Sequence, residues 1–417
     1  MGFGRDRASS SSNELRDPPP PPEREDTALI GDGKHLSSQP KTFANLFIAI
    51  VGAGVLGLPY TFKRTGWLTT LLMVFAIAAL THYCMMLLIH TRRRLETLTG
   101  FSKIASFGDL GFAVCGSFGR ILVDVLIILA QAGFCVGYLV FIGKTMADLL
   151  NSSKSFYILG CLPFQLGLNS IKTLTHLAPL SIFADVVDLG AMSVVMVQEA
   201  LVVVRNGAVV RAFGGFSEFF YGLGVAVYAF EGIGMALPLE SEMRDKKKFG
   251  KVLAFTMVFL SLIYVGFGIL GYLAYGDETQ DIITANLGPG VVSTLVKLGL
   301  SVNLFFTLPL MMNPVYEIVE RRFWGGTYCL WLRWLWVLIV ILVALFVPNF
   351  GDFLSLVGSG VCCALGFVLP SLFHFLVFKD EMGKVAWFSD VTIFVVGIFL
   401  GVSGTWYALQ EMFAVKV

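Results

Sequence analysis

Residues 48–59 place three glycines and a proline inside an apolar segment that is long enough to cross a lipid bilayer. Glycine and proline both interrupt a helix. Inside a bilayer, backbone that is not helical is tolerated only where protein or a polar cavity surrounds it, because each amide or carbonyl that faces lipid costs several kcal/mol. We therefore predict a broken helix that borders a cavity.

Residues 228–238 repeat this pattern in the second half of the chain. When the pairs Leu58-Pro59 and Leu237-Pro238 are aligned, the two glycine-rich runs superimpose. Two spans that are interrupted by glycine and proline at corresponding places in two halves are the best sequence indication of a secondary transporter with its site at the bilayer midplane. The pattern favours such a transporter.

The composition agrees with a membrane protein that crosses the bilayer many times. Hydrophobic residues make up 56% of the 417 residues and charged residues only 14%, which is too apolar for a soluble core of this length. The charges lie in short clusters between apolar runs of about 20 residues, the length that spans a bilayer. The net charge of +1 gives no basis for a nucleic-acid partner.

We find no pattern that indicates catalysis, a cofactor or a metal. The seven cysteines show neither a CxxC spacing nor a Cys/His ligand spacing, so neither a disulfide framework nor a zinc site is expected. No Walker motif for ATP-driven transport is present, and no residues are arranged for nucleophilic or metal catalysis. The chain is not expected to be an enzyme.

The predicted fold is an all-α integral membrane domain at residues 41–417, after a disordered tail at residues 1–40 that is rich in serine, proline and charge. Eleven candidate spans are predicted at residues 42–63, 66–90, 120–149, 156–171, 177–203, 217–239, 251–275, 290–315, 331–349, 353–378 and 387–411.

Basic residues predict the orientation of these spans. Most loop lysines and arginines, including those at 92–94 and 246–248, fall on the same side as the N-terminal tail, whereas the acidic loop 277–281 falls on the other. The positive-inside rule then places the N-terminus in the cytosol and, with eleven spans, Val417 outside it.

The first and sixth spans run in opposite directions, which predicts a five-plus-five inverted repeat. Its first half covers about residues 42–203 and its second about 217–378, and the span at 387–411 is extra.

Several motifs combine with the eleven spans to carry a family resemblance: Lys41-Thr42-Phe43-Ala44-Asn45, the first break, Tyr60, Gly66-Trp67, Phe230-Glu231-Gly232-Ile233-Gly234 and Leu237-Pro238-Leu239-Glu240. With them, nearly everything after residue 40 resembles the amino acid/auxin permease family, and most of all its plant vacuolar-type members. The resemblance implies a leucine-transporter-like fold with broken spans 1 and 6, and proton-coupled export of small neutral amino acids from vacuole to cytosol. Animal relatives carry a histidine beside the first break, whereas this chain has Asn45, so their proposed proton site cannot be carried over.

A broken helix offers complements to both ends of an amino acid zwitterion. Amides near residues 54–57 can donate to the carboxylate with help from the positive helix end, and carbonyls near residues 50–52 can accept from the ammonium group. The alternative is that the glycines only allow close helix packing. The predicted substrate-binding residues are Ile50, Gly52, Ala53, Gly54, Val55, Leu56, Gly57, Tyr138, Tyr228, Phe230 and Gly232.

Three residues are candidates for proton coupling: Glu231, Asn303 and Thr307. Glu231 is an ionisable group predicted at mid-membrane, where such groups are functional candidates by default, and burial favours protonation of a carboxylate. The alternative is a structural acid that binds freed amides. Asn303 and Thr307 are four residues apart on one helix face; in sodium-coupled relatives of the fold, hydroxyls of the eighth span help to hold an ion. The alternative is hydrogen bonding between helices. The fold analogy also makes Tyr138 a candidate for closing over the substrate carboxylate, and a packing role is its alternative.

Two further patterns concern location. Glu25, Leu29 and Ile30 in the tail fit an acidic dileucine-type sorting signal, which adaptor complexes read on the way to vacuoles. Asn151 begins a glycosylation acceptor pattern on the side away from the cytosol. We therefore expect a vacuolar-membrane transporter whose partners are neutral L-amino acids, protons, lipid and an adaptor complex. An amino acid sensor, a channel and a plasma-membrane importer are the alternatives.

Overall fold

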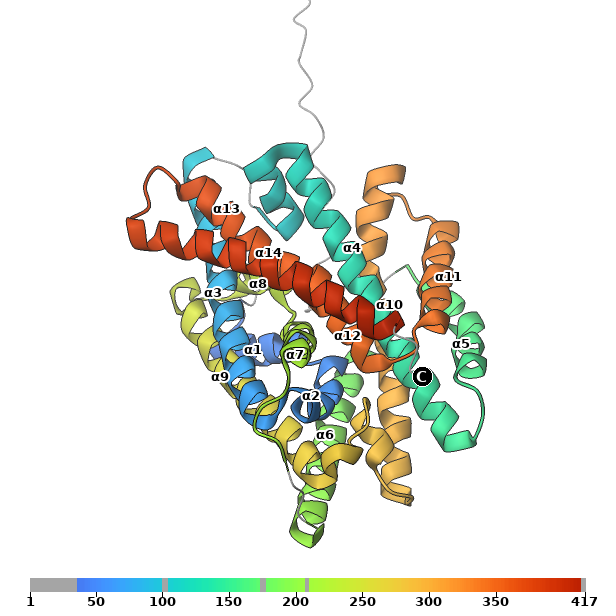
Figure 1. Cartoon of the computed structure of the whole chain (residues 1–417). Coiled ribbons are helices and arrows are strands. Elements are labelled where there is room, and N and C mark those ends of the chain that lie inside the picture. Colours follow the sequence, from blue (N-terminus) through green and yellow to red (C-terminus); the bar gives the residue numbers. More distant parts are fainter. Residues whose placement is uncertain (1–35, 100–103, 173–177, 207–209, 414–417) are drawn as a thin grey trace, which may run out of the picture. The chain divides into compact units, whose positions relative to one another are not determined.

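The computed structural model describes residues 36–99, 104–172, 178–206 and 210–413, which form an all-helical protein with no strand among them (Figure 1). The helices are α1 Gln39–Ile50, the 3₁₀ turn η2 Ala53–Gly57, α2 Leu58–Thr65, α3 Trp67–Thr99, α4 Phe107–Leu150, α5 Lys154–Asn169, α6 Ala178–Asn206, α7 Phe216–Ala229, α8 Ile233–Glu242, α9 Phe249–Tyr275, α10 Val291–Trp324, α11 Leu330–Phe346, α12 Phe350–Val357, the π-helical turns η7 Gly358–Cys362 and η8 Ala364–Val368, α13 Leu369–Phe378 and α14 Lys384–Phe413.

The lengths of the apolar helices show a membrane protein with many spans. Within the described ranges, eight helices are long and apolar enough to cross a bilayer, and the bent pair Gln39–Ile50 and Ala53–Thr65 makes a ninth. The helix α11 is apolar but has only 17 residues, and α5 has 16. The prediction of eleven spans therefore depends on these two shorter helices and stays a prediction, as do the limits of the two repeats. The predicted disordered tail lies almost entirely outside the described residues.

The first predicted break is confirmed. Helix α1 ends at Ile50, and the chain bends by 53° before it resumes as η2 and α2. Gly52 at the bend has extended backbone with φ −157° and ψ −169°, which no helix contains. Pro59 lies in the first turn of α2. Amides in the first turn of a helix have no carbonyl partner within the helix, so the missing amide hydrogen of proline costs no hydrogen bond there.

The second predicted break is also confirmed. Helix α7 ends at Ala229, and α8 begins at Ile233 after a short non-helical stretch in which Gly232 has φ −178° and ψ 9°. Pro238 lies inside α8 and cannot donate a helical hydrogen bond. Both interruptions therefore lie inside the glycine- and proline-containing segments from which they were predicted.

Glycines bring α7 into backbone contact with the segment formed by α12 and η7, next to the second break. Figure 1 shows α7 in the middle of the helices, and α2 and α12 both pack against it. A Cβ atom at Gly224 of α7 would collide with the Ser355 carbonyl, and one at Gly358 would collide with the Gly224 carbonyl. Such small-residue contacts give membrane helices the close packing that lipid does not drive.

A buried ionic cluster joins the end of α3 to α8. Arg92 forms an ion pair with Glu240, whose side chain is 0% exposed, and Arg92 Nη1 also donates to the Leu237 carbonyl at 3.0 Å. Arg93 Nη2 lies 2.6 Å from Glu240 Oε1. The cluster therefore fixes the second half of a broken span to its neighbour.

The same end of α8 is held by the segment before α1. The Ser37 amide donates to the Glu242 carbonyl at 2.9 Å, and the Arg244 amide donates to the Ser37 carbonyl at 3.1 Å. These bonds form an isolated β-bridge between Ser37 and Met243.

We predict that Glu240→Gln lowers stability by about 3–5 kcal/mol, because removing one partner of a buried ion pair leaves the other charge unpaired. The measurement is the thermal unfolding temperature of the detergent-purified protein. Glu381→Gln is the matched control, since Glu381 pairs with the adjacent Arg94 at an exposed position, where an ion pair contributes less than about 1 kcal/mol. Equal unfolding temperatures for the two variants would contradict the structural role of the cluster.

Candidate functional site

The two breaks face each other. A Cβ atom at Gly54 would lie 2.8 Å from Cδ1 of Tyr228 and 2.9 Å from Cα of Ala229. One at Gly232 would lie 2.7 Å from Cγ1 of Ile50. Each break therefore has a glycine where the backbone of the other approaches, and this reciprocal contact forms one site from two distant segments.

Tyr264 of α9 joins the two breaks by hydrogen bonding. Its hydroxyl lies 3.1 Å from the Ala229 carbonyl and 3.4 Å from the Ile50 carbonyl, the last residues of α7 and α1. These carbonyls lie where each helix ends, so they have lost the regular helical ladder. Tyr264 is fully buried, and its ring lies 5.0 Å from that of Phe230. The sequence interpretation did not single it out.

Open space remains at the break, next to Gly52. Apart from Gly52 and its two chain neighbours, no described residue has an atom within 4 Å of the place where a Cβ atom of Gly52 would stand. Val51, Gly52, Glu231 and Gly232 are half-buried, whereas most of their neighbours along the chain are buried. The structure thus separates the glycines: Gly54 and Gly232 serve contact between the breaks, and Gly52 borders a space.

The groups around this space include hydrogen-bond donors and acceptors. The first hydrogen bond of η2 runs from the Val55 amide to the Gly52 carbonyl at 3.3 Å, so the amides of Ala53 and Gly54 precede the ladder. Such amides at a helix start attract anions. The carbonyls of Ile50 and Gly52 already have partners, Tyr264 and Val55.

Glu231 lies in the second break, two residues before α8 begins. Its carboxylate accepts a hydrogen bond from the Ile233 amide, and its own amide donates to the Tyr228 carbonyl at 3.3 Å. The contact with Ile233 matches the structural role considered for this acid. A proton-carrying role for Glu231 stays a prediction.

Aromatic side chains form a wall between α4 and the second break. The rings of Phe134 and Tyr228 meet edge to face, with centroids 4.9 Å apart. A Cβ atom at Gly137 would lie 3.2 Å from the Tyr228 hydroxyl. That hydroxyl is buried and has no hydrogen-bond partner among the described residues. Tyr138, the next residue of α4, is also buried.

The remaining predicted site residues take different places. Ala53, Val55 and Leu56 are buried in η2, and a Cβ atom at Gly57 would lie 3.0 Å from Leu354 of α12. Thr307 Oγ1 donates to the Asn303 carbonyl at 2.9 Å and lies 3.0 Å from Asn303 Oδ1, so the pair bonds within α10, which packs mainly against α4 and α6. Asn151 is exposed at the end of α4. Glu25, Leu29 and Ile30 lie outside the described residues.

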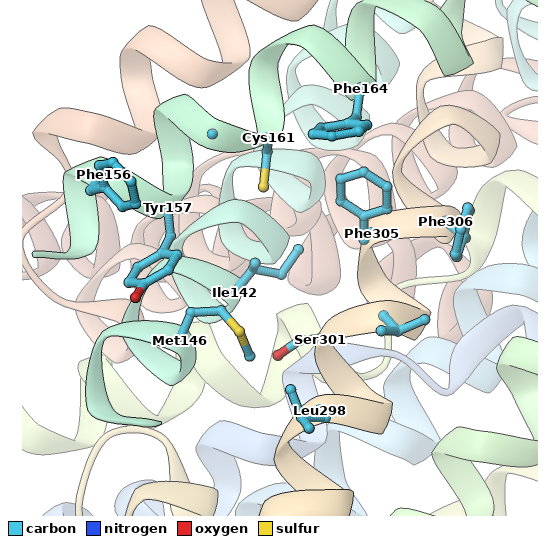
Figure 2. Close-up of a pocket in the computed structure, with 12 residues that line it drawn as sticks. Ile142, Met146, Phe156, Tyr157, Cys161, Phe164, Leu298, Ser301, Phe305 and Phe306 are labelled. Atoms are coloured by element: carbon cyan, nitrogen blue, oxygen red, sulfur yellow. The ribbon is translucent and has the colours of Figure 1, made fainter. Parts of the chain in front are cut away.

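A large hollow away from the breaks is apolar. It has a volume of about 510 Å³ and lies between α4, α5 and α10, where Phe164, Phe305 and Tyr157 point into it (Figure 2). A zwitterion would find almost no polar partner there.

A second hollow of about 490 Å³ is polar and includes Lys63, Lys144 and Asp281 in its lining. Among the described residues, no group of three or more His, Cys, Asp or Glu side chains could hold a metal ion.

The sequence matches a known family over most of its length. Residues 35–410 match the family model described as "Transmembrane amino acid transporter protein". The Arabidopsis thaliana protein "Amino acid transporter AVT3C" is 65% identical over the full length of both chains. "Amino acid transporter AVT3B" from the same plant is 68% identical, over 94% of this chain and 97% of that protein.

A yeast protein matches at lower identity, and two solved structures match in fold. "Vacuolar amino acid transporter 4" of Saccharomyces cerevisiae is 25% identical over 93% of this chain and 60% of its own length. Among solved structures, the inward-facing conformation of Mhp1 matches with a TM-score of 0.58 at 14% identity, covering 91% of this chain and 90% of that one. A closed conformation of Mhp1, a nucleobase-cation-symport-1 family transporter, matches with a TM-score of 0.53 at 15% identity, covering 93% and 95%.

The likeness to Mhp1 shows the fold alone and agrees with the predicted leucine-transporter-like fold. Family and relatives indicate a transporter and not an enzyme. The chain belongs to the transmembrane amino acid transporter family, also called the amino acid/auxin permease family, and is a multi-pass membrane protein.

Proposed function

We propose that the chain is a secondary active transporter that moves small neutral amino acids from the vacuole to the cytosol together with protons. The observation that carries this proposal is the pair of helix breaks that face each other and border an open space. A space of this kind between two broken spans suits an occluded substrate and alternating access.

The geometry suggests how a zwitterion would bind. The amides of Ala53 and Gly54 are assigned to the carboxylate, because they precede the first hydrogen bond of η2. The Val51 carbonyl is assigned to the ammonium group, since the carbonyls on either side of it already have partners. Tyr138 and Tyr228 would close one side of the site.

The vacuolar location is supported by the printed names of relatives, such as the yeast vacuolar transporter. The loop charges support an N-terminus in the cytosol and a C-terminus in the lumen. In this orientation the acidic lumen supplies the protons that drive export.

The test is transport by the purified full chain in proteoliposomes. A labelled panel of amino acids is offered by counterflow and by net uptake, with and without a pH gradient. The proposal predicts exchange of small neutral amino acids, and net uptake that is driven from the acidic side. Binding without any exchange would support an amino acid sensor instead of a transporter. Uptake that does not respond to the pH gradient would contradict the proposed coupling to protons.

We predict that Gly52→Val lowers transport at least about tenfold while the protein still folds. The extended backbone of Gly52 suits a β-branched residue, and its side chain would fill the open space instead of striking protein. Initial uptake rates and the thermal unfolding temperature are measured together. Gly190→Val is the control, because Gly190 also has open space beside it but lies at an exposed position of α6. If Gly52→Val took up substrate at the wild-type rate, the substrate site would not lie at the first break.

We predict that Glu231→Gln abolishes accumulation driven by a pH gradient but retains exchange. An amide resembles the protonated acid in shape but cannot release and rebind a proton, because it does not titrate. Gradient-driven accumulation and counterflow are measured on the same proteoliposomes, so counterflow reports on folding and substrate binding. Accumulation at the wild-type level would leave Glu231 with the structural role alone.

We predict that changing Leu29 and Ile30 to alanine moves the transporter from the vacuolar membrane to the cell surface. Uptake from acidic medium should then become measurable with unchanged substrate preference, because the cell exterior and the vacuole lumen are both on the non-cytosolic side. Fluorescence microscopy of the tagged protein locates it. Thr27→Ala, which leaves the acid and both apolar residues in place, is the control. Vacuolar location of the double variant would refute the sorting signal.

A further inference from the structure

Glu199 of α6 is a buried acid without a partner. Its side chain is 0% exposed, and neither carboxylate oxygen has a hydrogen-bond partner among the described residues. An isolated ionised carboxylate in such surroundings is strongly unfavourable, so the group takes up a proton instead. In this packing we therefore treat Glu199 as the neutral acid.

The carboxyl group lies where three helices meet. A Cβ atom at Gly271 of α9 would stand 2.8 Å from Glu199 Oε1 and 2.7 Å from Cβ of Pro59 in α2. The missing side chain of Gly271 thus leaves room for both groups. Pro59 belongs to the outer half of the first broken span, so this acid lies at the contact that holds that half in place.

The surrounding helices supply no opposite charge. The ionisable neighbour on α9 is the phenol of Tyr275. Among the described residues, no charged side chain of α2, α9 or α10 compensates a charge on Glu199. The helices α2 and α6 both pack against α9, and the place of Pro59 on α9, beside Glu199, therefore depends on the proton of Glu199 and not on an ion pair.

We propose that Glu199 is a second proton-binding site, whose protonation from the acidic lumen allows α2 to pack on α9 beside α6 and thereby close the lumenal side. When the carboxyl loses its proton to water, the charge must be hydrated, and α2 moves away from α9 and Glu199. The proton bound in the lumen is held as the O–H of the acid while the lumenal side is closed. The proposal rests on the proposed function for its orientation and for the source of the proton.

The first test reads the protonation state of Glu199 without any substrate. Infrared spectra of the purified full chain at neutral pH should contain a carbonyl band of a protonated carboxylic acid that disappears in Glu199→Gln. Glu278→Gln is the control, because Glu278 is an exposed acid shortly after the same end of α9, and its spectrum should keep the band. An unchanged band in Glu199→Gln would overturn the proposal.

The second test follows transport as the lumen-side pH is raised, with labelled neutral amino acids as probes. For the two protons that Glu199 and Glu231 would each require, the wild-type rate should fall by up to about tenfold per proton for each pH unit above the titration points. Glu199→Gln and Glu199→Met, which are uncharged at position 199 at every pH, should keep the rate measured in acid, and their rate should fall by up to about tenfold less per pH unit than that of the wild type. Should the first variant fail to fold, the second still decides. Variants that follow the wild-type pH profile would contradict the proposal.

The two tests separate the possible failures. If the wild type transports no amino acid, the proposed function is wrong, and the infrared result still decides whether Glu199 carries a proton. If the wild type transports and the variants keep its pH profile, only the role of Glu199 is wrong.

Discussion

The structure depends on how two interrupted helices satisfy their backbone inside an apolar protein. At each break the last carbonyl of the preceding helix has lost its helical bonding, and an unpaired carbonyl in hydrocarbon would cost several kcal/mol. The Tyr264 hydroxyl lies within 3.1 Å of one such carbonyl and 3.4 Å of the other. Glycines at positions 54 and 232 then let the two breaks approach closely enough for both carbonyls to share the one hydroxyl hydrogen of Tyr264.

Helix α9 connects the two breaks to α2, the second half of the first broken span. Tyr264, Gly268 and Gly271 are spaced by four and three residues, so they share one helix face. Tyr264 holds the breaks, Gly268 receives Phe62 of α2, and Gly271 leaves room for Pro59 and the Glu199 carboxyl. A change in the packing of α2 near Glu199 would therefore shift the face of α9 that holds Tyr264 and the two breaks, two helical turns away. In the proposed transporter, this shared face would be the physical route by which a bound proton and a bound substrate influence each other.

Local signals in the sequence predicted the two breaks correctly, because glycine and proline act on the backbone wherever they occur. The same signals could not predict which glycine borders the site and which permits close packing. Gly52 borders open space, whereas Gly54 contacts Tyr228, and this difference arises only from the packing of segments that are distant in the sequence. The role of Tyr264 could not be predicted, because in the sequence a tyrosine within an apolar span looks the same as an aromatic residue that only fills space. Glu199 could be suspected from its charge, but its missing partners depend on α2 and α9, which are distant in sequence. The helices α5 and α11 have only 16 and 17 residues. A count by apolar length alone therefore gives up to nine spans among the described residues, two fewer than the eleven predicted from the sequence.

The central claim is that the facing breaks form the amino acid site. The most direct measurement is a structure of the full chain with a transported amino acid bound, determined by electron cryo-microscopy. The account predicts the substrate carboxylate within about 3 Å of the Ala53 and Gly54 amides and the ammonium group at the Val51 carbonyl. Density for the amino acid in the polar hollow near Lys63, Lys144 and Asp281, with the breaks left empty, would contradict it.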